Sequence, residues 1–129
     1  MTWLLDTHVL LWALGDPDRL SRAARRILRD PDEQLAVSAA SAWEIATKQR
    51  LGKLPGTEVL TAQFSRHLRH LGARTADITA EHTLLAGQFD WAHRDPFDRM
   101  LAAPAMTESW TLVTQDAAFA ALPTVRTLW

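Results

Sequence analysis

Four acidic residues stand where carboxylates from distant parts of the chain could act together, each close to the end of an apolar run or the start of a helical pattern. They are Asp6, Glu44, Asp98 and Asp116. Carboxylates gathered in one place repel one another and are costly to keep ionised unless a cation neutralises them. No histidine or cysteine pair stands at metal spacing in these segments, so an oxygen ligand set typical of Mg²⁺, with Mn²⁺ as a possible substitute, is expected.

A divalent cation held by carboxylates next to basic residues is suited to phosphodiester hydrolysis. Such a cation activates water and offsets the charge that develops on the phosphate. Basic side chains near the acids could contact phosphate, although solvated surface charge also explains any one of them. The candidates are Lys48, Arg50, Lys53 and Arg99, and His93 could touch the substrate.

Each acid also has a purely structural interpretation. Ser41 and Glu44 form the S-x-x-E pattern of a capping box, and Asp95 is a natural N-cap before a proline. Asp98 suits the positive end of a helix dipole, and Asp116 could cap a following helix. The complete set is harder to explain in this way than any single member.

Alternating short strands and helices are predicted to position these residues. Apolar runs predict strands at 2–5, 35–37 and 111–114, with further strands at 74–78 and 123–128. Apolar periodicity, caps and Gly or Pro breaks predict helices at about 7–14, 21–29, 38–50, 58–71, 79–89, 95–103 and 117–122. This order favours a three-layer α/β/α sandwich on a mainly parallel sheet. The carboxyl ends of parallel strands share one edge, so the acids are expected to meet there.

Composition sets limits on the class of protein. A chain of 129 residues is expected to form a single domain, 1–129, with a substantial core. Cysteine is absent, and no apolar stretch is long enough to span a bilayer, so a soluble cytoplasmic protein with no membrane partner is expected. The formal net charge is −1, so nucleic acid would have to bind a local basic patch.

Four motifs in order resemble those of the PIN-domain family, and more narrowly the VapC-type toxin ribonucleases of bacterial toxin-antitoxin pairs. They are LDTHVLLW at 5–12, VSAASAWEIA at 37–46 with LGKL at 51–54, DPFDRMLAA at 95–103, and LVTQD at 112–116. The resemblance runs from near the first residue to near the last.

This resemblance implies a PIN fold with a five-stranded parallel sheet and Mg²⁺-dependent cleavage of RNA. It also implies an antitoxin protein that blocks the acidic groove, and a homodimer. Carried over by position, the catalytic and metal-binding acids are Asp6, Glu44, Asp98 and Asp116, with Asp95 as an additional acid ranked below Asp98 and with Thr7 and Thr114 placing hydroxyls beside the metal.

One departure from the family pattern keeps alternatives open. Pro104 follows DPFDRMLAA, and a proline inside a helix removes a backbone donor and is expected to kink or end the helix. If Asp98 were displaced as a result, the domain would be a weak nuclease or a non-catalytic binding module. A phosphatase of the haloacid dehalogenase type also uses a strand-terminal Asp, but it needs a second Asp two residues later, where this chain has His8.

Overall fold

A computed structural model describes all 129 residues and contains one five-stranded sheet. The strands are β1 (Thr2–Leu5), β2 (Gln34–Ser38), β3 (Ala73–Ala76), β4 (Thr111–Val113) and β5 (Arg126–Leu128). Their order across the sheet is β3-β2-β1-β4-β5, and every neighbouring pair is parallel. The predicted α/β architecture with a five-stranded parallel sheet is confirmed.

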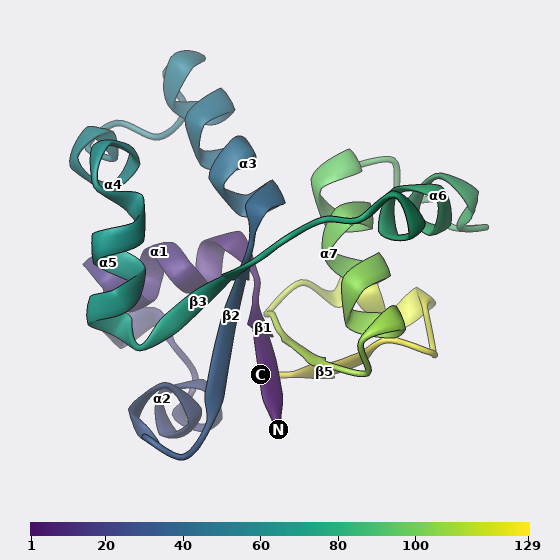
Figure 1. Ribbon diagram of the computed structural model, residues 1–129, viewed down its shortest axis with the longest axis horizontal. Helices are drawn as coiled ribbons and strands as arrows, with labels where there is room; N and C mark the ends of the chain where they lie inside the picture. The colour runs from purple at the N-terminus through teal and green to yellow at the C-terminus, as the bar shows by residue number, and fades with distance from the viewer.

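Helices connect the strands and cover both faces of the sheet (Figure 1). They are α1 (Thr7–Gly15), α2 (Arg22–Arg29), α3 (Ala39–Arg50), α4 (Glu58–Ala62), α5 (Phe64–Leu71), α6 (Ala80–Gln88) and α7 (Pro96–Thr107), with 3₁₀ turns η1 (Pro17–Arg19) and η2 (Ala117–Ala121). The helices α1 to α5 contribute to the core on one face, and α7 and η2 to the core on the other. None of these helices is long and apolar enough to cross a membrane.

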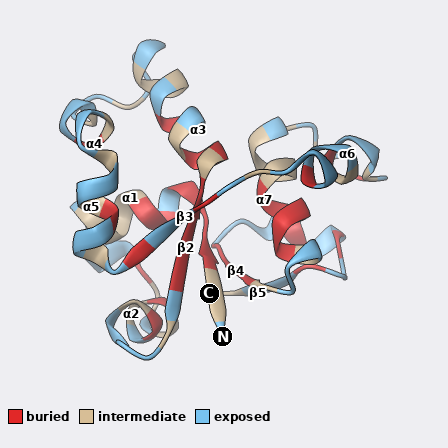
Figure 2. Cartoon of the chain, viewed as in Figure 1, coloured by how far each residue is buried: buried red, intermediate tan, exposed pale blue.

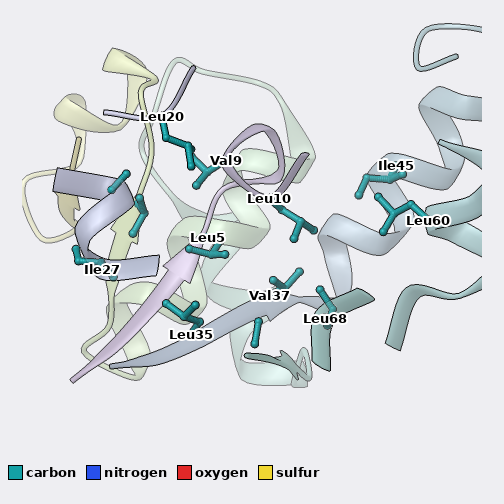
Figure 3. Close-up of a cluster of buried hydrophobic side chains, with 13 residues drawn as sticks. Leu5, Val9, Leu10, Leu20, Ile27, Leu35, Val37, Ile45, Leu60 and Leu68 are labelled. Atoms are coloured by element: carbon teal, nitrogen blue, oxygen red, sulfur yellow. The ribbon is translucent and has the colours of Figure 1, made fainter. Parts of the chain in front are cut away.

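Two apolar cores lie on opposite faces of the sheet because successive side chains of a strand point in opposite directions. On β1, Leu5 faces the cluster that also holds Val37 of β2, whereas Leu4 faces the cluster that holds Phe119 of η2. Figure 3 shows the first cluster, in which Leu5 lies among side chains of the helices and of β2. The central strands are buried along most of their length (Figure 2).

The predicted helix over 58–71 is wrong in one respect, because the structure divides it into α4 and α5. Gln63 separates them with φ −132° and ψ 42°, which lies outside the helical region. Leu60 of α4 and Leu68 of α5 nevertheless reach the same apolar cluster. The two edge strands also differ from their predicted ranges. The strand predicted at 74–78 is β3, which ends at Ala76, and the strand predicted at 123–128 is β5, which covers only Arg126–Leu128.

Pro104 does not end its helix, contrary to one of the expectations from the sequence. The helix α7 runs from Pro96 to Thr107, and the Pro104 ring is fully buried inside it. Asp98 lies in the first turn, six residues before the proline, where the missing N–H of Pro104 affects none of its bonds. The start of α7, and with it Asp98, therefore keeps a regular helical position.

The order in which strands are added to the sheet reverses between β1 and β4. The carboxyl ends of these two neighbouring strands lie at that point. From β1 the chain moves outward through β2 to β3, and it then returns to the other side of β1 for β4 and β5. In open α/β sheets ligands bind beyond the strand ends at such a switch point. Asp6 directly follows β1, and Asp116 lies three residues after β4.

Candidate active site

A cleft of about 350 Å³ opens at this switch point and collects every acid that the sequence singled out. The carboxylates in its wall are those of Asp6, Glu44, Asp95, Asp98 and Asp116, and the remaining lining residues are His8, Val9, Trp12, Lys48, Gln115 and Ala117. These acids come from four separate segments of the chain, spread over 110 residues of sequence. The expectation that they gather in one cavity is therefore met.

Asp6 joins β1 to α1 and is buried at the floor of the cleft, with 7% of its surface exposed. Its Oδ1 caps α1 by accepting from the His8 N–H at 2.9 Å, and its Oδ2 accepts from the Thr114 hydroxyl at 2.6 Å. Burial raises the pKa of Asp6 above its ordinary value, and these two hydrogen bonds lower it by less. The ionised form of Asp6 is thus costly until a positive charge arrives.

Glu44 is even more buried, at 4% exposed, and both of its carboxylate oxygens have partners. The Thr7 hydroxyl donates to Oε1 at 2.6 Å, and the Lys48 ammonium lies 2.5 Å from Oε2. Burial tends to lower the pKa of Lys48, but the hydrogen bond and charge of Glu44 outweigh that effect and raise it. Lys48 therefore stays charged and holds Glu44 in place inside the cleft.

The capping-box interpretation of Ser41 and Glu44 is wrong. The helix α3 begins earlier, with Ser38 as its N-cap, whose Oγ accepts from the Ala40 N–H at 3.0 Å. The Ser41 hydroxyl instead lies 2.9 Å from that of Thr7. Glu44 is consequently free of any capping role and points to the cleft.

Asp98 lies in the first turn of α7 and pairs with His93, whose Nε2 is 2.5 Å from Asp98 Oδ2. Burial raises the pKa of Asp98 to about 6, while the His93 hydrogen bond lowers it and the negative charges of Asp95 and Asp6 raise it further. A carboxyl with such a pKa is half protonated in mildly acidic solution. A cation bound beside Asp98 would stabilise its ionised form and so oppose the effect of burial on its pKa.

Asp95 and Asp116 serve as caps, as their structural interpretation predicted, and also line the cleft. Asp95 Oδ1 accepts from the N–H groups of Phe97 and Asp98 at 2.9 and 3.4 Å, which fixes the start of α7. Asp116 Oδ1 accepts from the Ala118 N–H at 2.9 Å, and its own N–H donates to Thr114. In both residues the second carboxylate oxygen has no hydrogen bond within the protein.

The donor set in this cleft fits a divalent cation. Ligand atoms of His93, Asp98 and Asp116 all lie within 4.8 Å of one another. Asp6 and Glu44 add two buried carboxylates to the cleft wall that Asp98 and Asp116 also line, and His93 lies beside that wall. The sequence predicted oxygen ligands alone, and it placed His93 only as a possible substrate contact. The structure adds its imidazole, which no periodic pattern in residues 89–95 could have revealed.

Arg99 has a different environment from the one expected of an RNA contact. Its guanidinium donates to four backbone carbonyls, those of Ala86, Phe89, Trp91 and His93, at 2.6 to 3.2 Å. These bonds tie the loop between α6 and α7 to the first turn of α7. Because its donors are committed in this way, Arg99 holds the loop that carries His93 and does not line the cleft.

Replacing Arg99 with methionine is expected to destabilise the protein and loosen this loop. Four partly buried carbonyls would lose a charged donor, at a total cost of about 2 to 4 kcal/mol in the free energy of unfolding. Chemical denaturation and limited proteolysis at residues 89–95 would measure the effect. Arg94→Met, at an exposed neighbour for which no side-chain bond is found, is the matched control. Equal stability of the two variants would contradict the role of Arg99.

The remaining basic candidates lie along α3 and its exit. Lys48 faces the cleft, whereas Arg50 and Lys53 are exposed at and just beyond the carboxyl end of α3. Only Lys48 is thus placed to meet a phosphate at the acids themselves.

Comparisons with known proteins agree with this architecture. The family model of the PIN domain matches residues 3–125. The chain is 36% identical over 118 residues to a protein named Ribonuclease VapC22 from Mycobacterium tuberculosis, which covers 89% of this chain and 87% of that protein. Among solved structures, VapBC2 from Rickettsia felis bound to a promoter DNA fragment aligns with a TM-score of 0.73 at 19% identity, covering 99% of this chain and 98% of the other. A toxin-antitoxin complex from Klebsiella pneumoniae aligns with a TM-score of 0.59 at 18% identity, covering 95% and 93%.

Proposed function

Since this chain belongs to the PIN domain family, we propose that it is a metal-dependent endoribonuclease and the toxin component of a toxin-antitoxin pair. The observation that carries the proposal is the cleft in which Asp6, Glu44, Asp98 and Asp116 come together. The relative named Ribonuclease VapC22, similar over most of its length, supports RNA as the substrate. We propose that the protein acts in the cytoplasm, as its sequence predicts.

In this proposal the chain's own residues bind the cation and orient the reacting groups. Asp6, Asp98 and Asp116 would hold the metal, and Glu44 would orient the attacking water from the position that Thr7 and Lys48 hold. The bound cation, Mg²⁺ or in its place Mn²⁺, would activate that water and offset charge on the phosphate. Asp95 supports the site by fixing the first turn of α7.

Phosphate contacts would come from the basic side of the cleft. The Lys48 ammonium lies at the cleft wall and is held by Glu44. A phosphate entering beside Glu44 would meet this charge first, and Arg50 and Lys53 would contact neighbouring phosphates of the strand. Lys48 is therefore the basic residue that we expect to matter most for cleavage.

The direct test is cleavage of RNA by the purified protein. We expect cleavage with Mg²⁺ or Mn²⁺ present, and complete loss of cleavage when a chelator removes them. Growth arrest on expression in bacteria, relieved by co-expression of the cognate antitoxin, would support the toxin role. Cleavage that persists in chelator would contradict the metal-dependent mechanism. A well-folded protein that binds no divalent cation and cuts no RNA would instead be a non-catalytic PIN-like binding module.

An antitoxin that blocks the acidic cleft is the proposed partner. The solved neighbours that share this fold include a VapBC2 structure and a toxin-antitoxin complex. The lining of the cleft is dominated by carboxylates, so a partner that inserts a basic side chain there would neutralise them and exclude the cation. A purified complex is therefore expected to bind divalent cations more weakly than the toxin alone.

We also propose that the protein forms a homodimer through the face near α3 and α7. Trp43 on α3 is 57% exposed, and its ring packs edge-on against Phe97 of α7 at 4.7 Å. Because the two rings are in contact, they form one apolar patch, and a contiguous exposed apolar patch can mark an interaction surface.

Replacing Trp43 with serine is expected to weaken this dimer. Loss of a central tryptophan costs about 2 kcal/mol or more, which raises the dissociation constant roughly thirtyfold. Light scattering coupled to size-exclusion chromatography would measure the mass as the protein is diluted. Val59→Ser, at an equally exposed apolar residue on α4, is the control that should leave the mass unchanged. A monomeric wild-type protein at all concentrations would contradict the proposal.

A further inference from the structure

His93 lies beside the cleft, where it is a nitrogen-bearing neighbour of Asp98 and Asp116, two of the acids in the cleft wall. It is in the loop between α6 and α7, its side chain is 32% exposed, and its Nε2 is 2.5 Å from Asp98 Oδ2. Ligand atoms of His93, Asp98 and Asp116 lie within 4.8 Å of one another. Two ligand atoms on opposite sides of an ion with bonds of about 2.1 Å are separated by roughly 4.2 Å. The three side chains thus need only small movements to share one ion.

The loop holds His93 in this position through contacts on both sides. Arg99 Nε donates to the His93 carbonyl at 3.1 Å, and the rest of its guanidinium anchors the preceding carbonyls. The His93 ring lies against the buried ring of Trp91, with centroids 4.8 Å apart. A ligand that is fixed before the ion arrives loses little conformational entropy on binding.

The chemistry of an imidazole differs from that of the surrounding carboxylates. Mg²⁺ takes oxygen ligands almost exclusively and keeps several waters, whereas imidazole nitrogen suits transition metals. Building on the metal-dependent function proposed above, we propose that His93 is a direct metal ligand together with Asp98 and Asp116, and that it biases this site toward Mn²⁺ over Mg²⁺. This assignment rests on the combination of one nitrogen ligand with two carboxylate ligands, and not on the acids alone.

A competing role for His93 is to hold Asp98 by a hydrogen bond without touching the ion. The two roles differ in whether a nitrogen atom is bonded to the metal. His8 offers a comparison, because it lines the cleft beside which His93 lies and its Nδ1 is 3.8 Å from Asp6 Oδ1. Only a spectroscopic measurement on the bound ion separates these possibilities, since either role would affect cleavage.

The test is electron spin echo envelope modulation of the full-length protein loaded with Mn²⁺. We expect a ¹⁴N coupling of a directly bound imidazole in the wild-type spectrum, its loss in His93→Gln, and its retention in His8→Gln. Each protein is also titrated with Mn²⁺, and the free ion is measured by its electron paramagnetic resonance signal. We expect His93→Gln to lower the affinity for Mn²⁺ on the order of tenfold or more. Competition by Mg²⁺ should show a much smaller change in the affinity for Mg²⁺. Circular dichroism would verify that both variants fold.

Each other outcome is decisive. Tight Mn²⁺ binding without a ¹⁴N coupling, or a coupling that survives in His93→Gln, would overturn the assignment of His93 while leaving a metal-dependent nuclease intact. Loss of the coupling only in His8→Gln would transfer the ligand role to His8. Failure of the wild-type protein to bind Mn²⁺ or Mg²⁺ at all would contradict the proposed function itself.

Discussion

Replacing Asp6 with asparagine is expected to abolish RNA cleavage while the protein stays folded. The amide oxygen can still cap α1 through the His8 N–H, so the local backbone keeps its bond. The negative charge at the floor of the cleft is lost, however, and with it one of the proposed ligands for the cation. Loss of this contribution to transition-state stabilisation is worth several kcal/mol, or a decrease in rate of roughly a thousandfold.

A quenched fluorescent RNA would measure cleavage by Asp6→Asn, and isothermal titration would measure its Mn²⁺ binding. Asp18→Asn removes an equal charge from the exposed turn η1, outside the cleft, and serves as the control. Asp95→Asn retains the capping oxygen of α7 and is expected to cause a smaller loss than Asp6→Asn. Full activity in a folded Asp6→Asn variant would show that this carboxylate is not a metal ligand.

The second large effect is a dependence of cation binding and stability on pH that centres on Asp98. Its pKa is raised to about 6 by burial, so the cation must displace a proton below that pH. Affinity for Mg²⁺ or Mn²⁺ is expected to fall by about tenfold per pH unit on the acid side of 6 if one proton is displaced.

Without a cation, Asp98 is expected to make the protein less stable as the pH rises. The folded state binds this proton more tightly than the unfolded chain, in which the pKa is near the ordinary 3.8. The contribution of Asp98 to the free energy of unfolding is therefore largest below about pH 4 and is lost as the pH rises through 6. Mg²⁺ should restore stability at neutral pH.

Thermal unfolding in chelator from pH 4 to 8 would measure this dependence. Asp98→Asn is the matched variant because it removes the titrating group and keeps a side chain of the same shape. We expect Asp98→Asn to be more stable than the wild type above pH 6 in chelator, and to gain little from Mg²⁺. Parallel stability curves for the two proteins across this range would contradict a raised pKa at Asp98.

Much of the fold could be predicted from local patterns in the chain. The apolar runs at 2–5, 35–37 and 111–114 mark the central strands, and the helices between them require parallel neighbours. Because the carboxyl ends of such strands share one edge, the positions of Asp6 directly after the first strand and of Asp116 shortly after the run at 111–114 already indicated a common site. Asp95 and Pro96 likewise predicted the start of α7, since N-capping depends on adjacent residues.

Only the tertiary structure decided how the site is completed. Its essential contacts join residues distant in sequence, such as Thr114 to Asp6 and Thr7 to Glu44, and no local pattern encodes them. The loop before α7 has no periodicity, and Arg99 determines its path by binding four carbonyls that carry no side-chain signal. That path brings the imidazole of His93 to the acids. The sequence by itself thus determined which carboxylates share the edge of the sheet, and packing decided which other groups join them, because burial and long-range hydrogen bonds form only when the chain is folded.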